Sequence, residues 1–252
     1  MLGRVTFGAA IGALLASNAL AQIEFKEDDK WRFALGAGWS HASGNSRANT
    51  LNATIDGAKA SSTDKLTFGG RYLRGETDGE TTADQLMLTA RYDRDLNEDI
   101  FAFGLGDFLR DRPANLNARL AGAVGVGHHV VKSERISFDV FGGVGYTYDD
   151  YVEATVVDGL TRSTYRSLNL LLGEESDHKI SETASFHQRL VLYPNLKDTG
   201  EFRGTFDAGV SVAINKHFSL TATLGYRYSS DPGLGVKRRD SLFVTGLSYR
   251  IE

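Results

Sequence analysis

The sequence predicts an all-β fold, a single antiparallel up-and-down transmembrane β-barrel of about 12 strands. Three observations support this prediction. Apolar and polar residues alternate with a period of two through most of the chain, as in a strand with one apolar face. Turn residues recur at regular intervals, and glycine is common (28 residues) whereas proline is scarce (3 residues). After the N-terminal segment no run of about 18 apolar residues occurs, which leaves a closed barrel as the way to cross a membrane.

The N-terminal segment has the composition of an export signal. Arg4 is the only charged residue in positions 1–21, and an apolar stretch follows it. Ala19-Leu20-Ala21 then provides a small-x-small cleavage pattern. We expect a signal peptide over residues 1–21 and an outer-membrane β-barrel over residues 22–252, exported through the periplasm. A retained anchor helix is the alternative, which the short, glycine-containing apolar stretch disfavours.

The composition bears on partners and cofactors. The chain has 28 basic and 32 acidic residues, a formal net charge of −4, which gives no support for nucleic-acid binding. It has no cysteine, which excludes disulfides and thiolate chemistry. We expect outer-membrane lipids and small solutes or ions as partners, with no nucleic acid, no metal and no cofactor.

The alternating segments, taken in order, give the strands. Their expected ranges are 31–41, 46–60, 64–75, 82–95, 100–110, 117–131, 136–150, 163–175, 180–193, 201–214, 218–229 and 240–251. Most exceed the roughly nine to eleven residues that a tilted membrane strand needs. A count of about ten or fourteen strands would also be compatible with the pattern.

Six segments alternate cleanly enough to assign their faces. Their apolar faces are Trp31, Phe33, Leu35, Ala37 and Trp39; Leu51, Ala53 and Ile55; Leu86, Leu88, Ala90 and Tyr92; Phe138, Val140, Val144, Tyr146 and Tyr148; Phe202, Phe206, Ala208, Val210 and Val212; and Phe218, Leu220, Ala222, Leu224, Tyr226 and Tyr228. Small and polar residues occupy the positions between them. Asp107 and Gln188 fall on the apolar faces of their strands, which either a bulge or a place near the rim would explain.

The connections provide an independent signal. On the side where the first strand begins, they are short: 61–63, 96–99, 132–135, 176–179 and 215–217. On the other side they are mostly longer: 75–81, 111–116, 150–162, 194–200 and 230–239, with the first hairpin, 42–45, as the exception. Outer-membrane barrels have short periplasmic turns and long external loops. Pro113, Pro194 and Pro232 all fall in the predicted long loops, where they remove no ladder hydrogen bond.

The apolar faces are expected to point outward, toward lipid. About 12 strands close to a diameter of roughly 24 Å, an interior too wide for alanine and valine to fill. Aromatic residues also gather toward the two ends of the strands, as in interfacial girdles. The expected girdles are Trp39, Tyr72, Tyr146, Tyr148, Tyr226 and Tyr228 at the long-loop end, and Trp31, Phe33, Tyr92, Phe101 and Phe218 at the other.

The charged residues of the opposite faces are then expected to line the lumen. The candidate lumen-lining residues are Arg32, Asp56, Arg71, Arg91, Asp93, Asp139, His187, Arg189, Arg203 and Asp207. Both signs of charge are present. The residues either pair across the lumen and plug it, giving a structural barrel, or line a narrow aqueous path with weak selectivity.

Several segments carry a resemblance to a known family. They are Ser43-Gly44-Asn45-Ser46, Arg110-Asp111-Arg112, the glycine-rich stretch 121–127, FGGVGYTYDDY at 141–151, AINKHFSLTATLGYRYSSDP at 213–232, Arg239-Asp240 and Ser248-Tyr249-Arg250. In this order and spacing the chain resembles the YdiY-like family of salt-induced outer-membrane proteins, a family of unknown function. The resemblance implies a porin-like barrel of the Gram-negative envelope and a link to salt or osmotic stress. It implies no catalytic residue.

We therefore expect an integral outer-membrane protein that is structural or a narrow small-solute channel, and not an enzyme. One alternative is a lipase-like outer-membrane enzyme, because Ser185 and His187 lie two apart on one strand face. By phase these two residues point to the lumen, away from acyl chains, and no Gly-x-Ser-x-Gly segment occurs. A less favoured alternative is a soluble periplasmic β-barrel that binds an apolar ligand.

Overall fold

The computed structural model describes residues 27–42, 48–157, 159–197, 200–231 and 238–251. The expected signal peptide and its cleavage site lie outside these residues. Twelve strands account for most of the described chain: β1 (Trp31–Ala42), β2 (Ala48–Ala60), β3 (Asp64–Thr77), β4 (Glu80–Asp95), β5 (Ile100–Asp111), β6 (Leu116–Lys132), β7 (Ile136–Val157), β8 (Leu160–Lys179), β9 (Ala184–Pro194), β10 (Phe202–Ala213), β11 (Phe218–Ser229) and β12 (Arg239–Ile251). Within the described ranges no helix is long and apolar enough to span a membrane.

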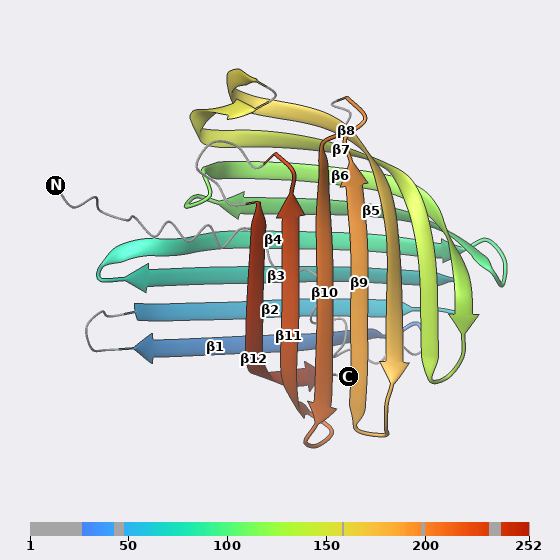
Figure 1. Ribbon diagram of the computed structural model, residues 1–252. Helices are drawn as coiled ribbons and strands as arrows, with labels where there is room; N and C mark the ends of the chain where they lie inside the picture. The colour runs from blue at the N-terminus through green and yellow to red at the C-terminus, as the bar shows by residue number, and fades with distance from the viewer. Residues whose placement is uncertain (1–26, 43–47, 158, 198–199, 232–237, 252) are drawn as a thin grey trace.

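The strands form one closed antiparallel barrel. Each strand pairs with its neighbours in sequence, and β1 pairs with β12 to close the sheet. Figure 1 shows β9–β12 crossing in front of β1–β4 at a steep angle, which reflects the strong tilt of the strands. Because closure gives every strand a partner on both edges, the backbone hydrogen bonds are satisfied within the sheet. The predicted number of strands and the up-and-down order are confirmed.

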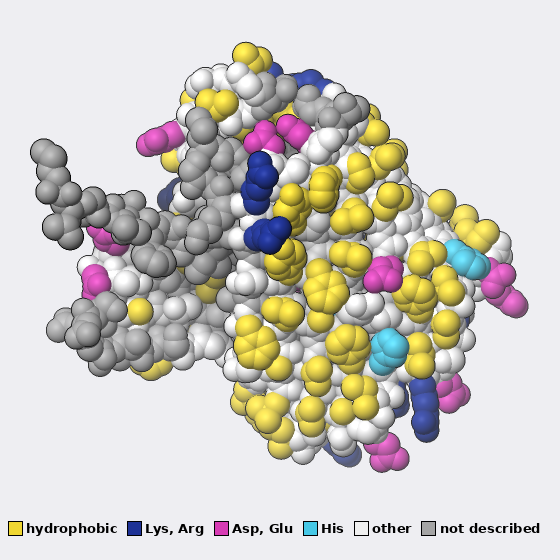
Figure 2. Space-filling view, in the orientation of Figure 1, with side chains coloured by type: hydrophobic (Ala, Val, Ile, Leu, Met, Phe, Trp, Pro, Cys, Tyr) yellow, Lys and Arg dark blue, Asp and Glu magenta, His cyan; other side chains and the backbone are white. Residues whose placement is uncertain are grey.

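The side chains are sorted as a lipid-facing barrel requires. Large apolar residues are exposed on the outer surface, among them Trp39 (72% exposed), Val124 (61%) and Leu88 (48%). Figure 2 shows hydrophobic side chains over much of one wall, with most charged side chains toward its margins. Charged residues such as Arg32 and Asp207 are instead buried inside. A soluble barrel would bury its apolar face, so that alternative is wrong.

Two of the predicted long loops are strand hairpins. β3 and β4 are joined by Asp78 and Gly79, whose positive φ angles of 52° and 86° suit a two-residue hairpin turn. β7 and β8 continue to pair as far as Val157 and Leu160, so residues 150–162 are not a loop. A strand that extends beyond the membrane can become polar without ending. The prediction from hydropathy therefore placed the ends of these strands too early.

Three smaller expectations about the connections are also corrected. The predicted turn 176–179 belongs to β8, and the chain turns instead at residues 180–183. Pro194 is the last residue of β9 and pairs with Phe202, so it is not in a loop. A strand tolerates proline at its end because few ladder bonds are lost there. Pro232 and the predicted hairpin at 43–45 lie outside the described residues.

The strand β5 presents Phe101 and Phe103 to the interior. Phe101 and Phe103 are 1% and 4% exposed, so the prediction that Phe101 belongs to an outer aromatic girdle is wrong. Gly104 and Gly106 occupy the outward positions beside them, where the backbone faces lipid. This phase also explains Asp107, which lies on the same inward face as Phe101 and Phe103 and needs no bulge.

Gln188 lies on the outer face of β9, as its phase predicted. Its side-chain amide donates a hydrogen bond of 3.2 Å to Glu174 Oε1 on β8. Gln188 is four residues from the start of β9 at Ala184, near the short-turn rim. Pairing with Glu174 at the rim satisfies two polar groups on a surface that is otherwise apolar.

The outward orientation makes a direct prediction for stability. Leu224 lies in the middle of β11 and is 41% exposed, so Leu224→Arg places a charge near the bilayer midplane. We expect it to lower the free energy of unfolding by about 2–4 kcal/mol. The control, Val212→Arg, alters an equally exposed outward residue (42%) at the short-turn end of β10, where about 0–1 kcal/mol is expected. Urea unfolding in lipid vesicles measures both, and equal losses at the two positions would contradict the assigned depth.

Candidate functional site

An apolar cluster fills part of the lumen. Its buried members come from β5 to β9: Phe101, Phe103, Ala123, Phe141, Leu171 and Val191. Glycine on neighbouring strands makes room for the rings, because a Cβ atom at Gly127 would collide with the Phe101 ring. The rings of Phe103 and Phe141 pack edge to face with their centroids 5.6 Å apart. Alternation alone did not predict apolar residues on the inner face of a membrane barrel.

Arg91 lies over this cluster. Its guanidinium carbon is 4.9 Å from the centre of the Phe141 ring and 5.1 Å from that of Phe103. Such distances correspond to favourable cation–π contact. Because the rings hold the planar guanidinium in the lumen, its N–H groups are directed toward the acidic residues beside it.

The charged residues around Arg91 form a bridge across the lumen. Arg91 pairs with Asp93 on the same strand at 2.8 Å and with Glu175 on β8 at 3.2 Å. Arg189 on β9 approaches the same Glu175 at 3.8 Å and lies over the Phe141 ring at 5.5 Å. We refer to Arg91, Asp93, Glu175 and Arg189 as the constriction. It connects β4 with β8 and β9, neither of which pairs with β4 in the barrel.

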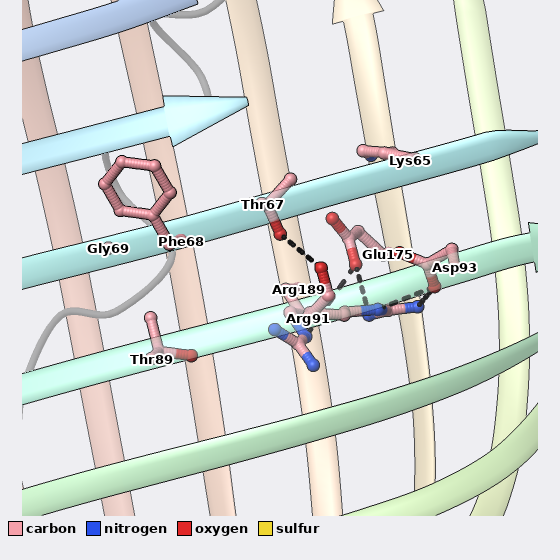
Figure 3. Close-up of a pocket in the computed structure, with 9 residues that line it drawn as sticks. All are labelled: Lys65, Thr67, Phe68, Gly69, Thr89, Arg91, Asp93, Glu175 and Arg189. Carbon is pink, nitrogen blue, oxygen red and sulfur yellow. Dashed lines mark hydrogen bonds and ion pairs between the residues drawn. The ribbon is translucent and has the colours of Figure 1, made fainter. Parts of the chain in front are cut away.

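The space left beside the constriction is small. Figure 3 shows a cavity lined by Lys65, Thr67, Phe68, Gly69, Thr89, Arg91, Asp93, Glu175 and Arg189. Its volume is about 20 Å³, room for one or two water molecules. This cavity admits water but not a larger solute without movement of side chains.

The constriction is held firmly. The side chains of Arg91, Asp93 and Glu175 are only 11–13% exposed, so water screens their charges weakly. Removal of one partner from a buried ion pair costs about 3–5 kcal/mol, because the other charge is left without compensation. Loss of either charge from these pairs is therefore expected to destabilise the barrel.

Further polar pairs lie on both sides of the constriction. Toward the long-loop end, Arg119 donates two hydrogen bonds of 2.6 Å to Asp149, and Arg203 donates one of 3.2 Å to Thr147. Arg227 pairs with Asp207 at 2.9 Å. The lumen therefore carries both signs of charge along its length.

The short-turn end of the lumen contains two histidine–carboxylate pairs. His129 Nδ1 is 2.7 Å from Asp139, and its Nε2 is 3.2 Å from Asp95. His187 Nδ1 is 2.8 Å from Asp177 Oδ1. The two pairs differ at Nε2. His129 Nε2 has a partner, whereas the buried Nε2 of His187 has no hydrogen-bond partner among the described residues.

Asp28 precedes β1 at the short-turn end of the barrel and pairs with Arg32. Arg32 donates hydrogen bonds of 2.9 and 2.6 Å to its carboxylate, and these hold the pKa of Asp28 at about 2, below its usual value of 3.8. Because the pKa is lowered in the fold, this contact stabilises the barrel above pH 3.8 and is lost as the pH falls through about 2.

All ten residues predicted to line the lumen occupy inward positions of their strands. Five are buried: Arg32, Asp56, Arg71, His187 and Asp207. Arg91, Asp93 and Arg189 meet at the constriction, Asp139 pairs with His129 and Arg203 faces Thr147. Sequence reasoning missed Glu175 although it lies in the predicted strand 163–175, and it missed Asp177 because it placed 176–179 in a turn. Continued period-two alternation through 171, 173, 175 and 177 would have placed both residues inside.

Ser185 and His187 lie on the same face of β9, as predicted, but not in a triad arrangement. His187 Nε2 has no hydrogen-bond partner, so it does not contact the Ser185 hydroxyl. A serine nucleophile needs its base within hydrogen-bond reach and oriented by a third group. Asp177 orients His187, yet the link from His187 to the serine is missing.

Two outer-membrane proteins of known structure are similar to this chain. The translocator domain of autotransporter NalP from Neisseria meningitidis is 17% identical, with a TM-score of 0.50, covering 89% of this chain and 91% of that one. An outer membrane channel from Pseudomonas putida F1 is 12% identical, with a TM-score of 0.48, covering 90% and 99%. The NalP likeness identifies the fold alone. The closed sheet and apolar exterior are those of an outer-membrane barrel.

Sequence comparison identifies the family. The chain is 23% identical over 198 residues to "Uncharacterized protein YdiY" of Escherichia coli (strain K12), covering 79% of this chain and 74% of that protein. A family model described as "Protein of unknown function, DUF481" matches residues 35–251. Both findings agree with the resemblance to YdiY-like proteins noted in the sequence. Because the match spans most of the chain, the protein belongs to this family of unknown function.

Proposed function

We propose that the protein is a narrow channel of the outer membrane, passing water and small ions, and that export through the periplasm brings it there. The observation that carries this proposal is the water-sized cavity beside the constriction, lined by Lys65, Arg91 and Arg189 and by Asp93 and Glu175. A cavity of about 20 Å³ would admit no sugar or larger solute unless side chains move.

The charges beside the cavity would decide which ions pass. Charged rings and clusters in a lumen tune selectivity, and basic residues favour anions. Three basic and two acidic side chains line this cavity, so a weak preference for anions is expected. Removal of a constriction arginine should shift the preference toward cations and widen the path.

A structural barrel with a sealed lumen is the second candidate. The apolar cluster and the buried ion pairs favour this second candidate. They occupy part of the interior and link β4 through β9 by side-chain contacts. In this case the interior would serve stability, and the protein would contribute to the envelope through its presence alone. Conductance separates the two candidates.

The test is conductance of the purified barrel in a planar bilayer. We expect small wild-type steps and, for Arg91→Ala, steps at least about twofold larger with selectivity shifted toward cations, because removing a lumenal cation widens the path and changes its charge. The control is Arg94→Ala, on the outer face of the same strand with its side chain 59% exposed, which should leave conductance unchanged.

The opposite outcomes are equally clear. An absence of steps in both wild type and Arg91→Ala, with each variant showing the heat-dependent gel mobility of a folded barrel, would contradict the channel and favour the structural role. Equal changes from Arg91→Ala and Arg94→Ala would show that the constriction does not control the path.

We also propose that the protein is not an enzyme. The support is the separation of His187 Nε2 from Ser185, together with their place in the lumen away from acyl chains. Lipid hydrolysis by the purified barrel that disappears in Ser185→Ala would overturn this view.

The family resemblance adds a physiological proposal, a role in the envelope response to salt or osmotic stress. A deletion strain should then grow more slowly than its parent at raised salt concentration, and plasmid-borne protein should restore growth. Identical growth of the two strains across salt concentrations would count against the role.

A further inference from the structure

Three potential metal ligands meet in the lumen near the short-turn end. Glu175 and Asp177 lie on β8, and His187 lies directly opposite Asp177 on β9. Each offers a ligand atom, and these atoms all lie within 4.8 Å of one another. An imidazole and a carboxylate at this spacing can reach a single ion after small side-chain adjustments, since metal–ligand bonds are about 2.0–2.2 Å long.

His187 has the arrangement of a metal ligand. Its side chain is 1% exposed, and its Nδ1 lies 2.8 Å from Asp177 Oδ1. A carboxylate at this position holds the proton on Nδ1 and leaves the Nε2 lone pair available, as in carboxylate–histidine–metal groups. Nε2 is buried without a hydrogen-bond partner among the described residues. Because a buried polar atom left unpaired is unfavourable, a metal ion bound here would satisfy this nitrogen.

Glu175 has an oxygen available, whereas both Asp177 oxygens are hydrogen-bonded, Oδ1 to His187 and Oδ2 to Ser137. Arg91 and Arg189 both contact the Oε2 atom of Glu175. Figure 3 shows the second oxygen of Glu175 without an interaction to the residues drawn. The Asp177 side chain is 37% exposed, which opens the cluster to solvent at the periplasmic mouth.

We propose that His187 and Glu175, with Asp177 as the carboxylate partner of the imidazole, bind a divalent transition-metal ion of the Zn²⁺ class. Imidazole with carboxylate suits Zn²⁺ and its neighbours, whereas Ca²⁺ and Mg²⁺ prefer all-oxygen sites. His187 supplies Nε2 and Glu175 supplies its second oxygen, while Asp177 orients the imidazole through Nδ1.

The surrounding charges permit a cation at this place. Lys65, Arg91 and Arg189 are the basic residues that line the adjoining cavity, and Asp93 and Glu175 are the acidic ones. With Asp177 included, the three basic and three acidic side chains cancel formally. The guanidinium groups will weaken the site relative to one without them, and Glu175 must share its charge between Arg91 and the metal.

A second histidine in the same lumen provides a matched control. His129 is also inward-facing, near the short-turn end and paired with carboxylates. Both of its ring nitrogens already have partners, Asp139 and Asp95. It therefore has no free nitrogen for a metal, and its replacement should not affect binding.

The experiment is titration of the EDTA-treated, purified full-length barrel with Zn²⁺ by calorimetry. We expect one ion per chain. His187→Gln and Glu175→Gln should each weaken binding by at least about 10-fold, whereas His129→Gln should remain within about twofold of wild type. Heat-dependent gel mobility verifies that each variant is folded.

A spectroscopic measurement on the wild type does not depend on the behaviour of variants. Cu²⁺ added to the EDTA-treated barrel should give an electron spin-echo modulation pattern from a single imidazole. Absence of saturable Zn²⁺ binding, absence of the imidazole signal, or equal losses in His187→Gln and His129→Gln would each overturn the proposal. These readouts are independent of whether the barrel conducts ions.

Discussion

The backbone of a sheet surrounded by acyl chains must have a hydrogen-bond partner on both edges of every strand, and this constraint governs the rest of the structure. Pairing of β1 with β12 fulfils it. Once the sheet is closed, alternate side chains must face either lipid or the lumen. The outer set becomes apolar because no water reaches it, and the inner set is free to carry the charges that the lipid face excludes.

The same constraint explains how much of the fold the sequence revealed. Strand number, order and facing followed from period-two alternation, because lipid penalises each polar outward residue. The alternation is weaker where a strand does not face lipid, because polar outward residues carry no cost there. Outside the membrane β7 and β8 continue as a polar hairpin to Val157 and Leu160, and these ends could not be seen from hydropathy. In β5, Gly104 and Gly106 face lipid while Phe101 faces inward. The expectation that a large aromatic residue faces lipid therefore placed Phe101 on the wrong face.

The candidate site was predictable only in part, for a related reason. Alternation assigns a side chain to the lumen but not to a partner across it. Arg91, Asp93 and Arg189 were therefore found, whereas their meeting with Glu175 depends on the curvature that brings β4 toward β8 and β9. The apolar cluster beneath Arg91 was missed because its rings occupy inward positions that the pattern reserves for polar residues. The constriction and the apolar cluster together give an interior that is both charged and narrow.

Spin-label accessibility along β11 tests the central claim, the outward placement of the apolar face, most directly. The chain has no cysteine, so single cysteines at positions 220–226 can be labelled uniquely. In lipid vesicles, labels at Leu220, Ala222, Leu224 and Tyr226 should collide readily with dissolved oxygen, which concentrates in acyl chains. Labels at Thr221, Thr223 and Gly225 should be protected from it. The opposite phase, or no alternation, would contradict the account.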